Sequence, residues 1–173
     1  PLRAVPGPQD AYVAPEGLET FFKVEYTLSP SADRMGCRLE GDGVIRHVKG
    51  PDIVSDGIPM GAVQVPGSGL PIVMMADRQT TGGYVKIAVV HALDVARLAQ
   101  KMPGDKVRFA RISVEEGMEL SRAEAAQVEK LRLMVQHAAA RAPRTPTSRA
   151  ARFGAMKLSV DGKNYAVTWE RLD

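Results

Sequence analysis

The segment at residues 77–84 gathers chemically active side chains of several kinds between two apolar stretches. Its members are Asp77, Arg78, Gln79, Thr80, Thr81, Gly82, Gly83 and Tyr84. The carboxylate can accept a proton, and the amide and hydroxyls can donate to a carboxylate or an amide. The two glycines let a ligand approach the backbone, where consecutive amides could hold a developing oxyanion. The alternative is a tight turn whose polar side chains satisfy their own backbone.

Two polar residues outside this polar segment are further candidates for substrate binding. Arg34 follows Asp33 at the start of an expected strand, and a surface ion pair is the alternative role for it. Gln64 alternates with Val63 and Val65, so its side chain lies on the opposite face of the strand from theirs. If that face is the barrel interior, Gln64 must be hydrogen-bonded, with the polar segment as a candidate partner.

The remaining reactive residue types give weaker signals. His91 ends an apolar strand, which favours a satisfied position at the end of a barrel over a catalytic role. Cys37 is the only cysteine, so an internal disulfide is impossible, and we expect a small packed side chain there. No Cys and His pair has the spacing of zinc ligands, so no metal site is predicted.

Short extended stretches bounded by glycine and proline must position these residues. The pattern predicts strands at residues 24–28, 34–39, 62–65, 71–76, 85–90 and 107–112. Residues 66–70 join two of them as a hairpin with a loop, and the stretch 85–90 is apolar enough to be central. A terminal hairpin is expected at 155–160 and 165–169 around the turn pair Asp161 and Gly162.

Three segments have helical patterns. Residues 15–23 predict a short helix, and Asp94 is expected to cap a helix at 95–101. Ser121 and Glu124 form a capping-box pattern that predicts the start of a long helix reaching about residue 140. Its apolar stripe must be covered, either by the chain's own barrel or by a partner.

Many short strands and few helices indicate a mainly β protein, a closed barrel with two principal helices, one of them long and C-terminal. We expect a barrel portion at 1–114, the long helix at 115–142, a linker at 143–152, and a hairpin at 153–173 that completes the same domain. The chain opens without Met on an apparent strand, which suggests entry part-way through a longer protein.

The composition is that of a globular protein, with 45% apolar and 25% charged residues. The net charge of +3 traces to arginines at 141–152, where a solvated linker is expected rather than a nucleic-acid partner. No secretory segment and no apolar run long enough for a bilayer is present, which predicts a cytoplasmic protein without a membrane partner.

The string at residues 74–84, together with the blocks at 31–41, 55–66 and 94–109, resembles the biotin-dependent carboxyltransferase family. That family includes the C subunit of 5-oxoprolinase, KipA-type proteins and the carboxyltransferase region of urea amidolyase. The resemblance covers residues 2–114. Val85 stands where the family usually has proline, and Cys37 stands where a larger apolar or aromatic residue is expected.

The resemblance implies a cyclophilin-like barrel, the second of two subdomains, whose N-terminal partner half is missing here. It also implies small amide or urea substrates, together with companion proteins of the oxoprolinase A type and of the B or KipI type. Asp77 and Tyr84 become acid and base candidates, and Arg78 either binds a substrate carboxylate or braces the loop. ATP would be used by the complex, no cofactor is expected on this chain, and biotin would serve only a urea carboxylase-type relative.

Two functions follow from the resemblance. The first is a contribution to ATP-dependent hydrolysis of 5-oxoproline, or to related amide or urea carboxyl transfer, inside a multi-subunit complex. The alternative is a non-catalytic regulatory protein of the KipA type that acts on a kinase-inhibitor partner. The intact polar segment favours catalysis, with the isolated chain expected to be inactive.

Overall fold

The computed structural model describes residues 1–141, 153–160 and 162–170, and the chain divides into two compact units, Pro1–Glu124 and Ala125–Asp173. Strands dominate the first unit, and three α-helices begin in it. Its strands are β1 (Leu2–Pro6), β2 (Tyr26–Leu28), β3 (Gly36–Glu40), β4 (Asp52–Gly57), β5 (Ala62–Val65), β6 (Ile72–Met74), β7 (Thr81–Val90), β8 (Lys106–Val107) and β9 (Phe109–Arg111). The helices are α1 (Pro15–Lys23), α2 (Ala92–Leu98) and α3 (Val114–Arg141).

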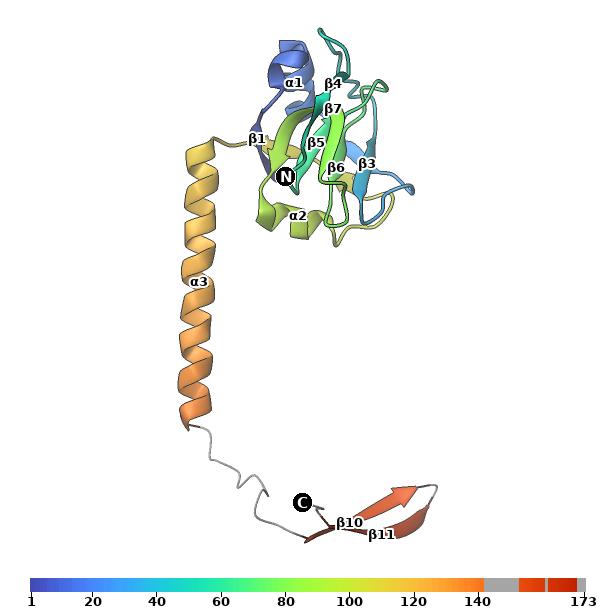
Figure 1. Cartoon of the computed structure of the whole chain (residues 1–173), viewed down its shortest axis with the longest axis vertical. Coiled ribbons are helices and arrows are strands. Elements are labelled where there is room, and N and C mark those ends of the chain that lie inside the picture. Colours follow the sequence, from blue (N-terminus) through green and yellow to red (C-terminus); the bar gives the residue numbers. More distant parts are fainter. Residues whose placement is uncertain (142–152, 161, 171–173) are drawn as a thin grey trace. The chain divides into compact units, whose positions relative to one another are not determined.

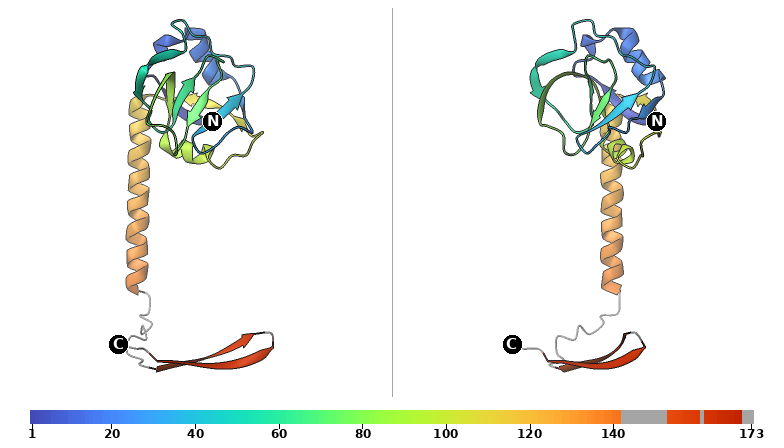
Figure 2. Two further views of the ribbon diagram at one scale, coloured as in Figure 1. Left: turned by 45° about the vertical axis from the view of Figure 1, so that its right-hand side comes forward. Right: turned by 90° about the vertical axis from the view of Figure 1, so that its right-hand side faces the viewer.

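Eight strands form a nearly closed mixed barrel in the order β8-β2-β3-β6-β5-β7-β1-β9, and β4 pairs with β7 beside this path. The two end strands, β8 and β9, are separated in sequence by Arg108 alone. Only β1 and β9 run parallel among the described strand pairs. The strands curve around a common interior, with α1 at one end of the barrel and α2 at the other (Figures 1 and 2). The prediction of a mainly β barrel is confirmed, with α1 as a third helix because the pattern at 15–23 forms a full helix of nine residues.

The barrel core is built from alternate strand residues and an aromatic cluster. Phe21 of α1 stacks on Phe109 of β9 with ring centroids 4.3 Å apart. Val63 and Val65 of β5 are fully buried in the same core. Because side chains alternate along a strand, the residue between those two valines is turned to the other face of the sheet.

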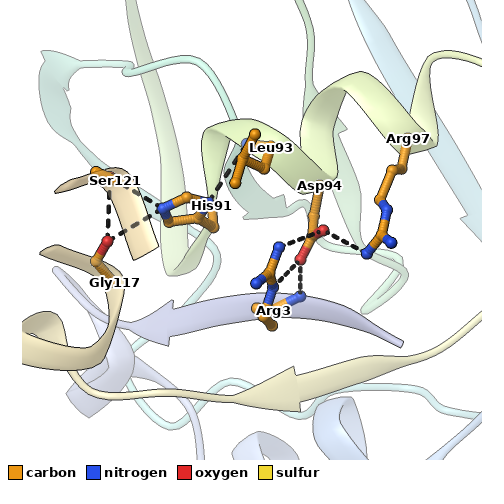
Figure 3. Close-up of polar contacts among 7 residues, drawn as sticks. All are labelled: Arg3, His91, Leu93, Asp94, Arg97, Gly117 and Ser121. Carbon is orange, nitrogen blue, oxygen red and sulfur yellow. Dashed lines mark hydrogen bonds and ion pairs between the residues drawn. The ribbon is translucent and has the colours of Figure 1, made fainter. Parts of the chain in front are cut away.

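The helix α2 begins three residues earlier than predicted, and Asp94 is not its cap. His91 is the N-cap, and its Nδ1 accepts a hydrogen bond from the Leu93 amide at 3.3 Å. Asp94 lies inside the helix and is fully buried. It accepts from the Arg3 amide at 2.7 Å and from Arg3 Nε at 2.6 Å, and Nη1 of the mostly exposed Arg97 donates to the same carboxylate at 3.1 Å (Figure 3). The residue therefore ties α2 to β1.

The long helix α3 also begins earlier than predicted, at Val114. Its capping box uses Ser113 and Glu116: the Ser113 amide donates to Glu116 Oε2 at 2.7 Å, and the Glu116 amide donates to Ser113 Oγ at 3.1 Å. The same Ser-x-x-Glu spacing occurs twice, so the expected box at Ser121 and Glu124 was the wrong copy.

Ser121 has a different role inside the helix. Its hydroxyl donates to the Gly117 carbonyl at 3.1 Å and lies 3.1 Å from Nε2 of His91 (Figure 3). His91 Nε2 also lies 3.1 Å from the Gly117 carbonyl. Both ring nitrogens of His91 are engaged in structural contacts, as the sequence predicted for this residue.

In the second unit, β10 (Phe153–Val160) and β11 (Lys163–Glu170) pair with each other antiparallel, which confirms the terminal hairpin. Asp161 and the linker at 143–152 lie outside the described residues. The apolar residues Val128, Leu131 and Val135 of α3 are exposed. The predicted domain boundaries, and the hairpin's role in completing the barrel domain, stay predictions. None of the helices in the described ranges is long and apolar enough to cross a membrane.

The buried Asp94 predicts a specific acid sensitivity of the fold. Burial alone would raise its pKa, but the hydrogen bonds and the charge of Arg3, together with a hydrogen bond from Arg97, outweigh burial and bring the pKa to about 2. Since the folded-state pKa lies below the unfolded value of 3.8, this contribution is complete above about pH 4 and is lost as the pH falls toward 2. Asp94→Asn should lose about 2–4 kcal/mol in urea unfolding at neutral pH and should lose less further stability in acid than wild type does.

The matched control is Arg97→Gln, which removes a mostly exposed partner of the same carboxylate and should cost less than about 1 kcal/mol. Parallel pH profiles for wild type and Asp94→Asn would contradict the account.

Candidate functional site

The polar segment is divided between a loop and a strand. Residues 77–80 follow β6, whereas residues 81–84 already belong to β7. Gly82 and Gly83 are therefore in extended backbone, where successive amides point to opposite edges of the strand. The two adjacent amides do not form a common oxyanion site in this conformation.

Asp77 and Arg34 hold each other at the start of the segment. Arg34 Nε donates to Asp77 Oδ2 at 2.5 Å and Nη2 donates to Oδ1 at 3.0 Å. The Asp77 amide also donates to the Arg34 carbonyl at 2.9 Å. These side-chain hydrogen bonds hold the pKa of the Asp77 carboxyl below its usual range. At neutral pH, Asp77 is therefore an ionised hydrogen-bond acceptor.

Arg78 braces the loop. Its Nε donates to the Ile58 carbonyl at 2.9 Å and its Nη1 donates to the Met75 carbonyl at 3.2 Å. Of the two roles expected for Arg78, the contacts favour bracing over the binding of a substrate carboxylate. The guanidinium attaches the stretch between β4 and β5 to the end of β6.

Gly82 lies against the buried amide of Gln64. A β-carbon at Gly82 would stand 2.7 Å from Ile58 Cδ1, 3.3 Å from Gln64 Nε2 and 3.6 Å from Gln79 Nε2. Gln64 is only 2% exposed, and its Nε2 has no hydrogen-bond partner among the described residues. The sequence made a hydrogen bond of Gln64 conditional on a position in the barrel interior, whereas the structure turns its side chain to the other face, next to a glycine that offers no side-chain acceptor for Nε2.

Lys86 and Asp56 belong to the same neighbourhood and were not predicted. Lys86 of β7 is the register partner of Gln64, and its side chain is 1% exposed. Its Nζ lies 3.2 Å from Oδ2 of Asp56, a carboxylate on β4 that is 55% exposed. A single lysine within the apolar run at 85–90 was the available sequence signal.

The other predicted residues of the segment are exposed. The Thr80 carbonyl accepts from the Ile58 amide at 2.9 Å, and Thr81 and Tyr84 pair with β4 through their backbones. The Tyr84 side chain is 43% exposed, and in the described part of the chain it makes no hydrogen bond to Asp77. The two acid and base candidates are not brought into contact by this structure.

A cavity of about 440 Å³ borders the start of the segment at Arg34. Leu28, Met75 and Leu98 contribute apolar walls, and Cys37 also lines it. Cys37 is buried, and burial, followed by the charge of nearby Asp33, raises the pKa of its thiol, which favours a packed side chain over a reactive thiolate. The described residues contain no group of three His, Cys, Asp or Glu side chains that could hold a metal ion.

The curated proteins with similar sequences include the C subunits of two 5-oxoprolinases. The 5-oxoprolinase C subunit of Haemophilus influenzae is 37% identical over 135 residues, which is 78% of this chain and 43% of that protein. The corresponding C subunit of Escherichia coli is 38% identical over 68% of this chain and 37% of its own length. The chain thus spans less than half of the curated relatives it matches.

Two solved structures are also similar. TTHA0988 has 38% identity and a TM-score of 0.53 over 63% of this chain and 20% of its own. The Kluyveromyces lactis urea amidolyase has a TM-score of 0.69 over 75% of this chain and 8% of its own, and its 21% identity supports the fold alone. Residues 1–111 match the family described as carboxyltransferase domain, subdomain A and B. The chain belongs to this carboxyltransferase domain family.

Proposed function

We propose that this chain supplies part of the reaction site of a 5-oxoprolinase-type assembly, which opens the cyclic amide of 5-oxoproline to glutamate with the use of ATP. The identity of 37–38% to the C subunits of two 5-oxoprolinases supports this proposal. Since the chain covers 37–43% of those proteins, the other half of the site and companion proteins of the A and B types would come from outside it.

The observation that carries the proposal is the buried donor of Gln64. Attack on an amide carbonyl places negative charge on its oxygen, and preorganised donors in a dry site stabilise that charge most effectively. Gln64 Nε2 is such a donor, since it is buried and has no acceptor among the described residues. Gln79 Nε2 and the hydroxyls of Thr80 and Thr81 are further candidates.

Asp77 would act as the acceptor that orients the attacking group. Two hydrogen bonds from Arg34 orient this carboxylate and favour its ionised form. Tyr84 stays the candidate acid, because this residue is exposed and its phenol can donate to a group entering from solvent. We assign the use of ATP to the companion proteins and expect no biotin on this chain.

Replacing the Asp77 carboxylate tests the role of the polar segment. In the full-length parent protein mixed with its companion proteins, Asp77→Asn should lower ATP-dependent release of glutamate from 5-oxoproline by about 100-fold or more. The matched control is Glu19→Gln on α1, since Glu19 also pairs with an arginine and is likewise 48% exposed.

The control should retain full activity and both variants should stay folded. Equal activity of wild type and Asp77→Asn would remove Asp77 from the site. A stable complex of wild-type components without any turnover would contradict the proposal and favour the regulatory binding role instead.

Gln64 should show opposite effects on stability and activity. Gln64→Met keeps the side-chain volume but removes a buried amide without a partner among the described residues, so the free energy of unfolding should rise by about 1–2 kcal/mol. The same change should lower turnover by about 10- to 100-fold, because a transition-state donor is lost. Denaturant titration and steady-state kinetics measure the two effects, and a loss of stability with unchanged turnover would show a purely structural role.

A further inference from the structure

Lys86 is a buried cation on a central strand. Its side chain is 1% exposed, and its strand neighbours Val85 and Ile87 are fully buried in the core. Burying an ammonium group is costly unless it is paired, and a fold that needed only packing would place an apolar residue there. Packing of the barrel core therefore does not explain why a lysine occupies this position.

The ion pair with Asp56 satisfies only part of the hydrogen-bonding capacity of the Lys86 ammonium group. An ammonium group has three N–H donors, and in the described part of the chain Nζ meets one acceptor, Asp56 Oδ2, at 3.2 Å. Asp56 is also held by Gln9 Nε2 at 3.2 Å and by the Gly57 amide at 2.7 Å. This carboxylate lies on β4, which pairs with β7 beside the barrel path. The register of the β4–β7 pairing shifts between Asp52 and Asp56.

Gln64, the neighbour of Lys86 on the adjacent strand, has a buried donor without an acceptor among the described residues. The two residues are register partners on β5 and β7. The other two cations next to the polar segment are already engaged, Arg34 by Asp77 and Arg78 by two backbone carbonyls. The pair formed by Gln64 and Lys86 thus presents buried donors and a positive charge, which suits an anionic acceptor.

We propose that Asp56 occupies the place of a substrate carboxylate on Lys86, and that a compact amide carrying a carboxylate binds Lys86 and Gln64 by displacing it. This inference rests on the proposed function, and it assigns the selection of a carboxylate-bearing substrate to Lys86. Lys86 would bind the carboxylate, Gln64 would bind the amide oxygen, and β4 would shift to release Asp56.

The test measures the affinity of the complete assembly for 5-oxoproline and for 2-pyrrolidinone, the same ring without the carboxylate. Lys86→Met should weaken 5-oxoproline binding by about 10- to 100-fold and leave 2-pyrrolidinone binding unchanged. Asp56→Asn should tighten 5-oxoproline binding by several-fold, because the internal competitor is weakened. Asp52→Asn is the matched control on the same exposed strand and should change neither affinity.

The two variants separate ligand binding from a structural role. A purely structural ion pair would make Asp56→Asn neutral or harmful for binding, and that result would overturn the inference even if Lys86→Met failed to fold. Equal wild-type affinity for the two compounds, or no binding of 5-oxoproline, would overturn it as well. Carboxylate-selective binding without turnover would contradict only the proposed function, whereas turnover with an unchanged KM in Lys86→Met would contradict only the inference.

Discussion

The pairing of β7 decides where the candidate functional groups lie. This strand pairs in succession with β4 at its start, with β5 along its middle and with β1 at its end. The pairing with β5 sets Lys86 beside Gln64, and the pairing with β4 brings Asp56 to the same lysine. Because side chains alternate along a strand, a slip of one residue would exchange these polar groups with the core valines. The register of β7 thus determines both the packing of the core and the positions of the candidate functional groups.

The buried side chains of Gln64 and Lys86 impose a cost that the rest of the fold must offset. A buried amide without a partner costs about 1–3 kcal/mol, which is a sizeable share of the stability of a typical domain. The barrel offsets it with the aromatic cluster around Phe21 and Phe109, and with the buried carboxylate of Asp94 that ties α2 to β1. Such a separation, with stabilising contacts in one region and unsatisfied donors in another, is typical of proteins that trade stability for function.

The sequence alone predicted part of the fold and part of the candidate site. The fold class, the central strand and the hairpin at 62–76 followed from alternation and breaker residues. The variety of polar side chains singled out the segment at 77–84, and the family resemblance gave it a candidate role. Lys86 was missed because its importance depends on the register between β5 and β7, which no local pattern encodes. The same limit applied to Asp94, whose partner Arg3 is 91 residues away, and to the duplicated capping-box pattern at the start of α3.

The most direct test of the central claim is to observe the side-chain amide of Gln64 as the site fills. Labelling with 15N-glutamine, with Gln64→Met to assign the signal, gives its proton shifts and exchange rate in the complete assembly. The account predicts that 5-oxoproline moves the Gln64 amide protons downfield and slows their exchange, since an acceptor then meets Nε2. An unchanged Gln64 signal at a 5-oxoproline concentration that saturates turnover would contradict it.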